Sequence, residues 1–375
     1  MLGLFLRRLG VDVTIYEART PERLALAGAF LAVAPNGMNV LEAAGVKARV
    51  MAAGDACHGF EFVNASGRTI ARVDDRDDAQ RYGSPLLVVR RTRLQRVLVD
   101  AALEAGVEVR HGAALVDVEP YDREVRATFE SGEAVTSDFL VGCDGIRSQT
   151  RALVLPESPA PASLEQLDYG GFARLAEAPV EVGCNLMVFG RRAFFGAFRA
   201  ADGELLWFHN GPKREDSLSE RERLLEAHAD DPPWINEVIS RTPEILGPWP
   251  LHDIASIPRW SMGRIAVIGD AAHAVSPTSG QGASLAMEDA MMLARCLEAT
   301  GDPERAFERL AQRRRARVEE VVRQSRRIGS TKVARTAFGA WLRDRMLPLV
   351  LPLGTAAQRR LYSYRVEVAD PRAGG

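Results

Sequence analysis

The residues best placed to do chemistry lie in one run, GDAAHAVSPTSGQGAS, which covers positions 269–284. Gly269 and Asp270 directly follow a short apolar run at 264–268, whose composition predicts a strand buried on both faces of a parallel sheet. A carboxylate at the end of such a strand lies where open α/β sheets bind ligands, so Asp270 can accept hydrogen bonds from ligand hydroxyl groups. The alternative is that Asp270 only caps the turn that follows.

Two glycines, Gly280 and Gly282, precede a predicted helix from Leu285 through Cys296. Glycines let a ligand approach the backbone closely, and the unpaired N–H groups of the first helical turn then point at it and favour negative charge. For the glycines alone, a plain loop-to-helix junction is the alternative. The combination of strand, acidic turn and glycine-rich helix start is far more specific.

This combination, G-D-A-A-H-x-x-x-P-x-x-G-x-G followed by E-D-A at 288–290, resembles the second FAD motif of single-component flavoprotein monooxygenases. These are the aromatic hydroxylases typified by p-hydroxybenzoate and salicylate hydroxylases. The resemblance implies that Asp270 binds the ribityl chain of FAD and that Gly280 to Ser284 faces the pyrimidine side of the flavin. A helix N-terminus there would stabilise the anionic reduced flavin. The family often has Asn at the position of Ser284. The resemblance therefore implies the same backbone contacts with the flavin more directly than it implies a contact of the Ser284 side chain.

Two segments in the first hundred residues resemble further cofactor contacts of the family. Gly28 stands in a loop that resembles the one passing over the flavin, with a plain turn as the alternative. Arg91 and Gln95 open a predicted helix after a strand-like run, and the resemblance implies that Arg91 contacts the FAD pyrophosphate and that Gln95 can touch the cofactor. Arg90 and Arg93 are alternatives to Arg91, with surface salt bridges as the role of the other two.

The run D-G-x-x-S-x-x-R from Asp144 follows another predicted buried strand. Asp-Gly is common in hairpins, which is the alternative for the dipeptide alone. The whole run resembles the motif through which members of the family contact both FAD and NAD(P)H. The resemblance implies that Asp144 and Gly145 meet the ribityl side, while Ser148 and Arg151 hold the loop in place. The predicted cofactor-binding residues are therefore Glu17, Gly28, Arg91, Gln95, Asp144, Gly145, Gly269, Asp270, Pro277, Gly280, Gly282, Ala283 and Ser284.

Glu17 belongs to this set because of the pattern at the beginning of the chain. Residues 2–10 predict the last turns of a helix, and residues 12–17 predict a strand that ends in an acid. In a dinucleotide-binding βαβ unit, an acid in that place holds the adenosine ribose hydroxyls. No G-x-G-x-x-G occurs in the chain, and without a preceding strand the neighbouring strand would keep an unpaired edge. We expect a start codon upstream of Met1, with a decayed enzyme as the alternative.

These patterns predict an α/β protein: an FAD-binding Rossmann-like three-layer domain, an inserted antiparallel β-sheet substrate domain and a helical C-terminal tail. The expected boundaries are 1–155 and 258–330 for the FAD-binding domain, 156–257 for the substrate domain and 331–375 for the C-terminal helical segment. Residues 107–110, 114–118 and 125–129 predict the strands of a β-meander. Residues 303–329 predict one arginine-rich helix, in which interspersed glutamates favour a solvated face over a nucleic-acid surface.

In the expected substrate domain, aromatic and polar residues alternate, which predicts a sheet whose apolar face covers a pocket. The candidates for that pocket, each with core packing as the alternative, are Phe172, Phe195, Trp207 and Phe208. Tyr169 and His209 lie in the same sheet, where we expect core packing. In some relatives the backbone at the proline matching Pro277 lies near the substrate. The catalytic residue that accepts the substrate's proton stays unknown.

Composition excludes several other classes of partner. With 46% hydrophobic residues, 26% charged residues and a net charge of −2, the chain has no global field that draws nucleic acid or a membrane. Its six histidines lack ligand spacing, so no metal is expected, and its four cysteines lack Cys-x-x-Cys spacing, which favours reduced thiols in the cytoplasm. We expect a monomer or homodimer that binds small molecules.

The resemblance therefore implies an FAD-dependent monooxygenase. It would use NADH or NADPH and O2, through a flavin C4a-hydroperoxide, to hydroxylate or epoxidise an aromatic or polycyclic substrate. One alternative is a related flavoenzyme such as a halogenase or a reductase, although the halogenase signature W-x-W-x-I-P is absent. Another is a truncated, non-catalytic flavin-binding protein.

Overall fold

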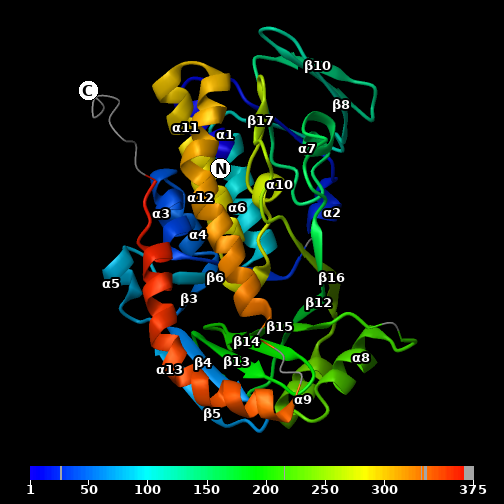
Figure 1. Ribbon diagram of the computed structural model, residues 1–375, viewed down its shortest axis with the longest axis vertical. Coiled ribbons are helices and arrows are strands. Elements are labelled where there is room, and N and C mark those ends of the chain that lie inside the picture. Colours follow the sequence, from blue (N-terminus) through cyan, green and yellow to red (C-terminus); the bar gives the residue numbers. More distant parts are fainter. Residues whose placement is uncertain (26–27, 215, 331, 333–335, 367–375) are drawn as a thin grey trace.

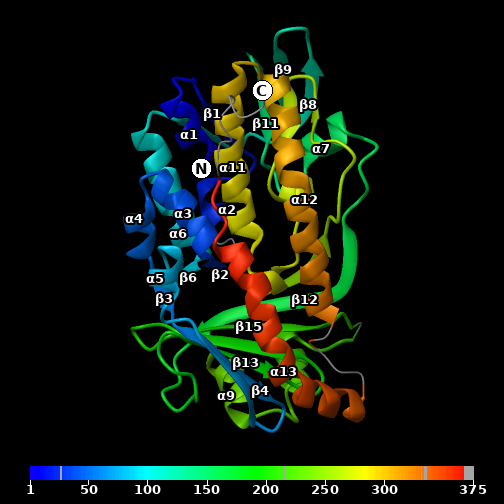
Figure 2. The ribbon, with the colours of Figure 1, turned by 60° about the vertical axis from the view of Figure 1, so that its left-hand side comes forward.

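The computed structural model describes residues 1–25, 28–214, 216–330, 332 and 336–366. Two parts are stacked along the long axis (Figures 1 and 2). In the upper part, α11 (Gly282–Thr300) and α12 (Pro303–Ser330) run side by side, and the lower part is a large sheet. The predicted α/β fold with an inserted sheet domain and helical C-terminal tail is confirmed.

Two short pairs of parallel strands lie in the upper part. One pair is β1 (Thr14–Glu17) and β7 (Glu108–His111). The other is β11 (Leu140–Gly142) and β18 (Ile265–Val267), with β17 (Ser261–Met262) antiparallel on the far edge of β18. Among the described residues no strand joins the pairs, so β1 and β11 each keep an unpaired edge, as the sequence predicts.

The prediction that 107–110 belongs to the meander is wrong. The preceding helix, α6 (Arg91–Glu104), returns the chain so that β7 lies beside β1 and parallel to it, and not beside the meander strands. The meander consists of the next three strands, which are antiparallel: β8 (Leu115–Pro120), β9 (Val125–Phe129) and β10 (Ala134–Ser137).

A small antiparallel sheet lies beside the helices of the upper part. It is formed by β2 (Phe30–Val33), β6 (Leu86–Arg90) and β3 (Gly54–Cys57). The shorter helices of this region are α1 (Leu2–Arg8), α2 (Pro21–Ala25), α3 (Pro35–Ala43), α4 (Lys47–Met51), α5 (Asp78–Tyr82) and α7 (Gln149–Val154). α11 packs against α1, α3 and α12, and its Leu285 and Leu293 are fully buried there. This packing makes α11 the central helix of the upper part.

The large sheet of the lower part has seven strands, in the order β16-β12-β15-β14-β13-β4-β5. Their bounds are β4 (Gly59–Asn64), β5 (Thr69–Asp74), β12 (Ala162–Ala173), β13 (Cys184–Phe189), β14 (Phe194–Arg199), β15 (Leu205–Pro212) and β16 (Leu246–Asp253). All neighbours are antiparallel except β13 and β4. The sheet thus combines a hairpin from the first hundred residues with five later strands.

Side chains alternate between the two faces of this sheet. The outer face buries Phe195 and Trp207 completely against two helices, α8 (Glu220–Ala227) and α9 (Pro233–Arg241). The inner face turns toward the upper part, because Phe172 and Phe208 contact Phe30 of β2, with ring centroids 6.4 and 6.3 Å apart. Phe172 and Phe208 are only partly buried. Of the four aromatic candidates for the substrate pocket, Phe172 and Phe208 therefore face the upper part. Phe195 and Trp207 belong to the hydrophobic core.

The C-terminal region is helical, as predicted. α13 (Ala337–Tyr362) is one helix that packs against β5 and α3 (Figure 2). Of the expected segment 331–375, positions 331, 333–335 and 367–375 lie outside the described residues, as does Ala27 of the predicted flavin loop. Within the described part of the chain, no helix is long and apolar enough to cross a membrane.

Candidate active site

Two of the predicted turns lie together at one edge of the parallel sheet. Gly142 pairs with Val267, and the N–H of Ile268 donates to the carbonyl of Gly142 at 3.1 Å, so β11 and β18 end side by side. The chain then continues into Asp144-Gly145 and into Gly269-Asp270, which begins the short helix α10 (Asp270–His273). Both acidic side chains are exposed at this edge, where open α/β sheets bind ligands.

Arg91 and Gly28 come to the same place. A Cβ atom at Gly28, whose φ is +76°, would lie 2.8 Å from Cδ of Arg91, so any side chain there would displace the arginine. Burial raises the pKa of Asp270, and the charges of His273 and Arg91 act in the opposite direction. Charges can lower the pKa of a carboxylate in this way only when they lie close to it. Arg91, Gly28 and Asp270 therefore lie near one another, and we call this region, where solvent reaches the carboxylate of Asp270, the recess.

The N-terminus of α11 faces this recess. Pro277 begins the single turn of 3-10 helix η1 (Pro277–Ser279) and is exposed, and Gly280 follows with a φ of +61°. The N-cap Gln281 makes no side-chain capping bond, and the first turn of α11 carries no acid. A Cβ at Gly282 would have Oδ1 of Asp270 as its nearest neighbour, 4.0 Å away. The free N–H groups of this turn can therefore bind a ligand that lies beside Asp270.

Ser284 has a different role from the one that the family's asparagine suggests. Its side chain is fully buried, and its Oγ accepts a hydrogen bond from the N–H of Ala34 at 3.2 Å. A Cβ at Gly37 would lie 2.6 Å from this Oγ, so α3 approaches α11 closely at this point. Ala283 is half-buried and packs against the same core. These two side chains hold α11 in place, while their backbone amides belong to the helix start.

The Asp144 loop is braced internally, as the resemblance implies for Ser148 and Arg151. The carboxylate of Asp144 accepts from the hydroxyl of Ser148 and from the N–H of Thr150 at 2.9 Å. Arg151 donates to the carbonyls of Ile146 and Ala271, both at 2.6 Å. Arg151 thus ties this loop to the Asp270 turn.

Glu17 and Gln95 are placed as the sequence predicts along their elements. Glu17 ends β1, is half-buried and accepts from the N–H of Arg19 at 2.9 Å. Gln95 lies one turn after Arg91 on α6 and is half-buried. The contacts of both with a cofactor stay predictions.

A buried ion cluster beneath the recess was missed by the sequence reasoning. Asp289 accepts from the N–H of Gly269 at 3.0 Å and from Nε of Arg314 at 2.7 Å, and it also contacts His273. Arg314 forms an ion pair with Glu288 at 2.6 Å, and the side chains of Glu288, Asp289 and Arg314 are fully buried. Burial alone would raise the pKa of Asp289, but the charges of His273 and Arg314 lower it to about 2.

This cluster corrects the prediction for the arginine-rich helix. Most of its charges are at least partly solvated, but Arg314 points inward, and Arg317 also binds Glu288 at 2.8 Å. Glu288 further accepts from Asn36 of α3 at 2.7 Å. The sequence does contain a signal for this cluster, namely the adjacent acids Glu288 and Asp289 in the FAD motif, because two acids on the buried side of a helix need cationic partners.

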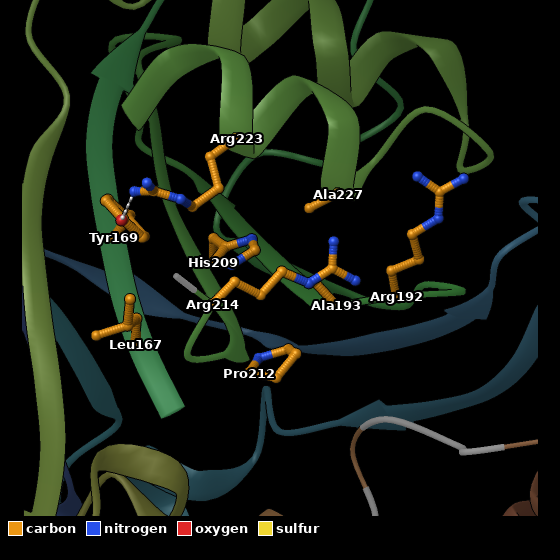
Figure 3. A pocket seen from close by; sticks show the side chains of 9 residues that line it. All are labelled: Leu167, Tyr169, Arg192, Ala193, His209, Pro212, Arg214, Arg223 and Ala227. Carbon is orange, nitrogen blue, oxygen red and sulfur yellow. Dashed lines mark hydrogen bonds between the residues drawn. The ribbon is translucent and has the colours of Figure 1, made fainter. Parts of the chain in front are cut away.

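The expected packing roles of Tyr169 and His209 agree with their positions on the outer face. Figure 3 shows a small pocket there, in which Arg223 donates to the hydroxyl of Tyr169 at 3.1 Å. Its volume is about 20 Å³, which suits a water molecule and not an aromatic substrate. His209 contacts His228 at 2.9 Å, and burial holds the pKa of His209 well below its usual value. This pocket lies on the opposite face of the sheet from the recess.

Comparisons with known proteins agree with this geometry. A family model described as an FAD binding domain matches residues 1–325. The aurachin C monooxygenase/isomerase of Stigmatella aurantiaca is 30% identical over 353 residues, which cover 93% of this chain and 91% of the relative. A 3-amino-4-hydroxybenzoate 2-monooxygenase of Streptomyces platensis is 31% identical over 358 residues, which cover 92% and 88%.

Solved structures show the same fold. Klebsiella pneumoniae HpxO, in complex with FAD and uric acid, superposes with a TM-score of 0.86 at 22% identity and covers 96% of this chain and 94% of its own. The recess at the edge of the parallel sheet, the matched domain and these relatives lead to one conclusion. The chain belongs to the FAD binding domain family, among the FAD-dependent aromatic hydroxylases.

Proposed function

We propose that this chain is a monooxygenase that uses bound FAD, NADH or NADPH and O2 to hydroxylate or epoxidise an aromatic or polycyclic small molecule. The observation that carries the proposal is the meeting of Arg91, Asp270 and the uncapped start of α11 in one recess. The relative that acts on 3-amino-4-hydroxybenzoate supports an aromatic substrate. The scattered cysteines fit a cytoplasmic location.

The residues of the recess fit the chemical groups of FAD. Arg91 supplies a cation for the pyrophosphate, and Gly28 leaves that guanidinium the room it needs. Asp270 supplies an acceptor for ribityl hydroxyls, and donation from such hydroxyls would stabilise a carboxylate whose pKa burial has raised. The N–H groups of Gly282, Ala283 and Ser284 supply donors for the pyrimidine edge of the flavin.

Bound FAD would supply the activation of O2, and the chain's own residues would control where that chemistry occurs. The positive end of α11 would favour negative charge on the flavin ring. The partly buried Phe172 and Phe208 face the upper part from the sheet, where they would hold a planar substrate and exclude water. The braced Asp144 loop would serve the flavin and a nicotinamide cosubstrate that binds transiently.

The test begins with the visible absorbance spectrum of the purified protein after incubation with FAD and desalting. NADH and NADPH oxidation is then measured with and without 3-amino-4-hydroxybenzoate, salicylate and 6-hydroxynicotinate, and products are identified by mass spectrometry. We expect a bound flavin, oxidation stimulated by an aromatic compound, and a product heavier by one oxygen atom. Asp270→Asn should weaken FAD binding at least about tenfold, or 1.4 kcal/mol, whereas the exposed Asp12→Asn should not.

The other outcomes separate the alternatives. A wild-type protein that never retains FAD would contradict the proposal. Retained FAD without NAD(P)H oxidation would indicate a non-catalytic flavin-binding protein. A product that forms only with halide, or a reduced product without added oxygen, would indicate a related flavoenzyme with different chemistry.

A further inference from the structure

Three polar side chains gather on the inner face of the large sheet, outside the recess described above. Asp168 of β12 and Asn210 of β15 are cross-strand neighbours, and Nδ2 of Asn210 donates to Oδ1 of Asp168 at 2.8 Å. Lys332, just after α12, is buried over two rings of the same sheet, with Nζ 4.6 Å from the centroid of Phe194 and 5.9 Å from that of Phe208. Lysine is rarely buried without a charged partner.

The face of the sheet that carries this polar group turns toward the Gly28 loop. Asp168 alternates with Gly170 and Phe172 along β12, and a Cβ at Gly170 would lie 3.4 Å from Cβ of Ala29, next to Gly28. From the other side, Oγ of Ser325 on α12 donates to the carbonyl of Ser276 at 2.9 Å.

The end of α12 stays close to this loop. A Cβ at Gly329 would lie 3.4 Å from Oγ1 of Thr278, and the N–H of Lys332 donates to the carbonyl of Gly329 at 3.4 Å. Lys332 is therefore held beside η1, which leads directly into the helix start that faces the recess.

The hydrogen-bonding capacity of these groups is not used up within the protein. Asn210 is 1% exposed, and its Oδ1 has no hydrogen-bond partner among the described residues. Asp168 attracts Lys332 electrostatically, but in the part of the chain that the structure describes no carboxylate forms a salt bridge with it. Burial lowers the pKa of Lys332 to about 8, and Asp168 partly offsets this effect. Asn210 thus offers a buried acceptor without a partner, and Lys332 offers a buried cation on the same face of the sheet, so that both can bind complementary groups of a ligand.

We infer that Lys332 is the anion-binding residue of the substrate site, and that the protein selects aromatic rings that carry an anionic oxygen. The ring would lie against Phe208, the anionic oxygen would contact the ammonium of Lys332, and a neighbouring N–H or O–H group would donate to Oδ1 of Asn210. Asp168 holds the amide of Asn210 in the required orientation. This inference rests on the proposed function and adds its substrate class.

The experiment measures ligand binding directly, by calorimetry and ligand-observed NMR on the FAD-treated protein. The probes are matched pairs: salicylate with salicylamide, 6-hydroxynicotinate with 6-hydroxynicotinamide, and 3-amino-4-hydroxybenzoate with its methyl ester. A third member of the last set, 3-aminobenzoate, lacks the hydroxyl group and so separates a carboxylate from a phenolate as the source of the anionic oxygen.

We expect Lys332→Met to weaken binding of at least one acid tenfold or more and its neutral partner less than twofold. Lys332→Arg should restore most of the affinity, and Lys213→Met, which removes an exposed lysine near the end of β15, should change nothing. Equal loss for acids and neutral partners, or wild-type protein that binds none of the acids at 10 mM, would overturn the inference. A protein that binds acids through Lys332 but never oxidises NAD(P)H would contradict only the proposed function.

Discussion

Replacing Asp289 by asparagine tests whether the buried ion cluster supports the Gly269 turn. Asp289 accepts from the N–H of Gly269 and from Arg314, and both charged side chains are fully buried. Asparagine has the same shape and keeps one oxygen that can accept from Gly269, but it leaves part of the positive charge of Arg314 uncompensated. Removing one partner of a buried ion pair costs about 3–5 kcal/mol. Since Glu288 still pairs with Arg314, we expect about 3 kcal/mol.

The pKa of Asp289 gives a second figure for the same interaction. A fall from 3.8 to about 2 corresponds to roughly 2 kcal/mol, since one pKa unit is worth about 1.4 kcal/mol. Because folding lowers this pKa, the stabilisation is complete above pH 3.8 and is lost as the pH falls from 3.8 towards 2. The difference between wild type and Asp289→Asn should therefore shrink as the pH falls below about pH 4.

Urea unfolding of both proteins, followed by circular dichroism at several pH values, measures this difference. The exposed Asp12→Asn, which removes the carboxylate of a surface ion pair with Arg7, is the matched control and should leave the free energy of unfolding unchanged. A difference below about 1 kcal/mol at pH 7, or one that does not shrink below about pH 4, would show that the cluster does not stabilise the fold as argued.

Three further predictions concern the recess and its surroundings. Gly28→Ala should lower FAD affinity at least about tenfold, because the added Cβ displaces Arg91. Gly112→Ala is the control and should leave the affinity unchanged, because Gly112 has a similar φ of +71° but a Cβ there would meet no atom within 4 Å. Flavin fluorescence measures both affinities. Ser284→Ala should lower the free energy of unfolding in urea by about 1–3 kcal/mol, because the buried N–H of Ala34 loses its acceptor. It should leave FAD affinity nearly unchanged, and a large loss of affinity would instead indicate that the side chain contacts FAD directly. Because only a protonated Lys332 attracts an anion, calorimetry should show that the affinity of the wild type for acids falls above pH 8, whereas that of Lys332→Arg does not. Two other charged residues lie near Lys332: Asp168 faces it from β12, and Arg343 of α13 contacts its backbone carbonyl. A flat profile in wild type would contradict this assignment.

The sequence predicted those elements whose pattern is local. The strand before Gly269 and the helix from 303 follow from periodicity and turn residues, and both occur in the structure. The pairing of β7 with β1 was missed because partner choice depends on the path of α6, which short apolar runs do not encode. The parallel contact of β13 with β4 was missed for the same reason, since it joins segments more than a hundred residues apart.

For the candidate site, the sequence indicated which types of residue are present, whereas the orientation of their side chains comes from the structure. Arg91, Gly28 and Asp270 share a recess, as a common ligand would require. The inward direction of Ser284 depends on the approach of α3, which no local pattern specifies. Arg314 looked like one more arginine of a solvated helix, because its buried partners lie on a different helix.

The position of α12 connects these findings. Near its middle, Arg314 binds Asp289 and thereby holds the turn that carries Asp270. Near its end, Ser325 binds Ser276 ahead of η1. The helix is thus fixed at two points on the segment that resembles the FAD motif, and Lys332, which follows it, is placed over the inner face of the sheet. The same ion cluster that supports the proposed cofactor turn therefore also sets where the proposed substrate cation lies, so a shift of α12 would disturb both sites together.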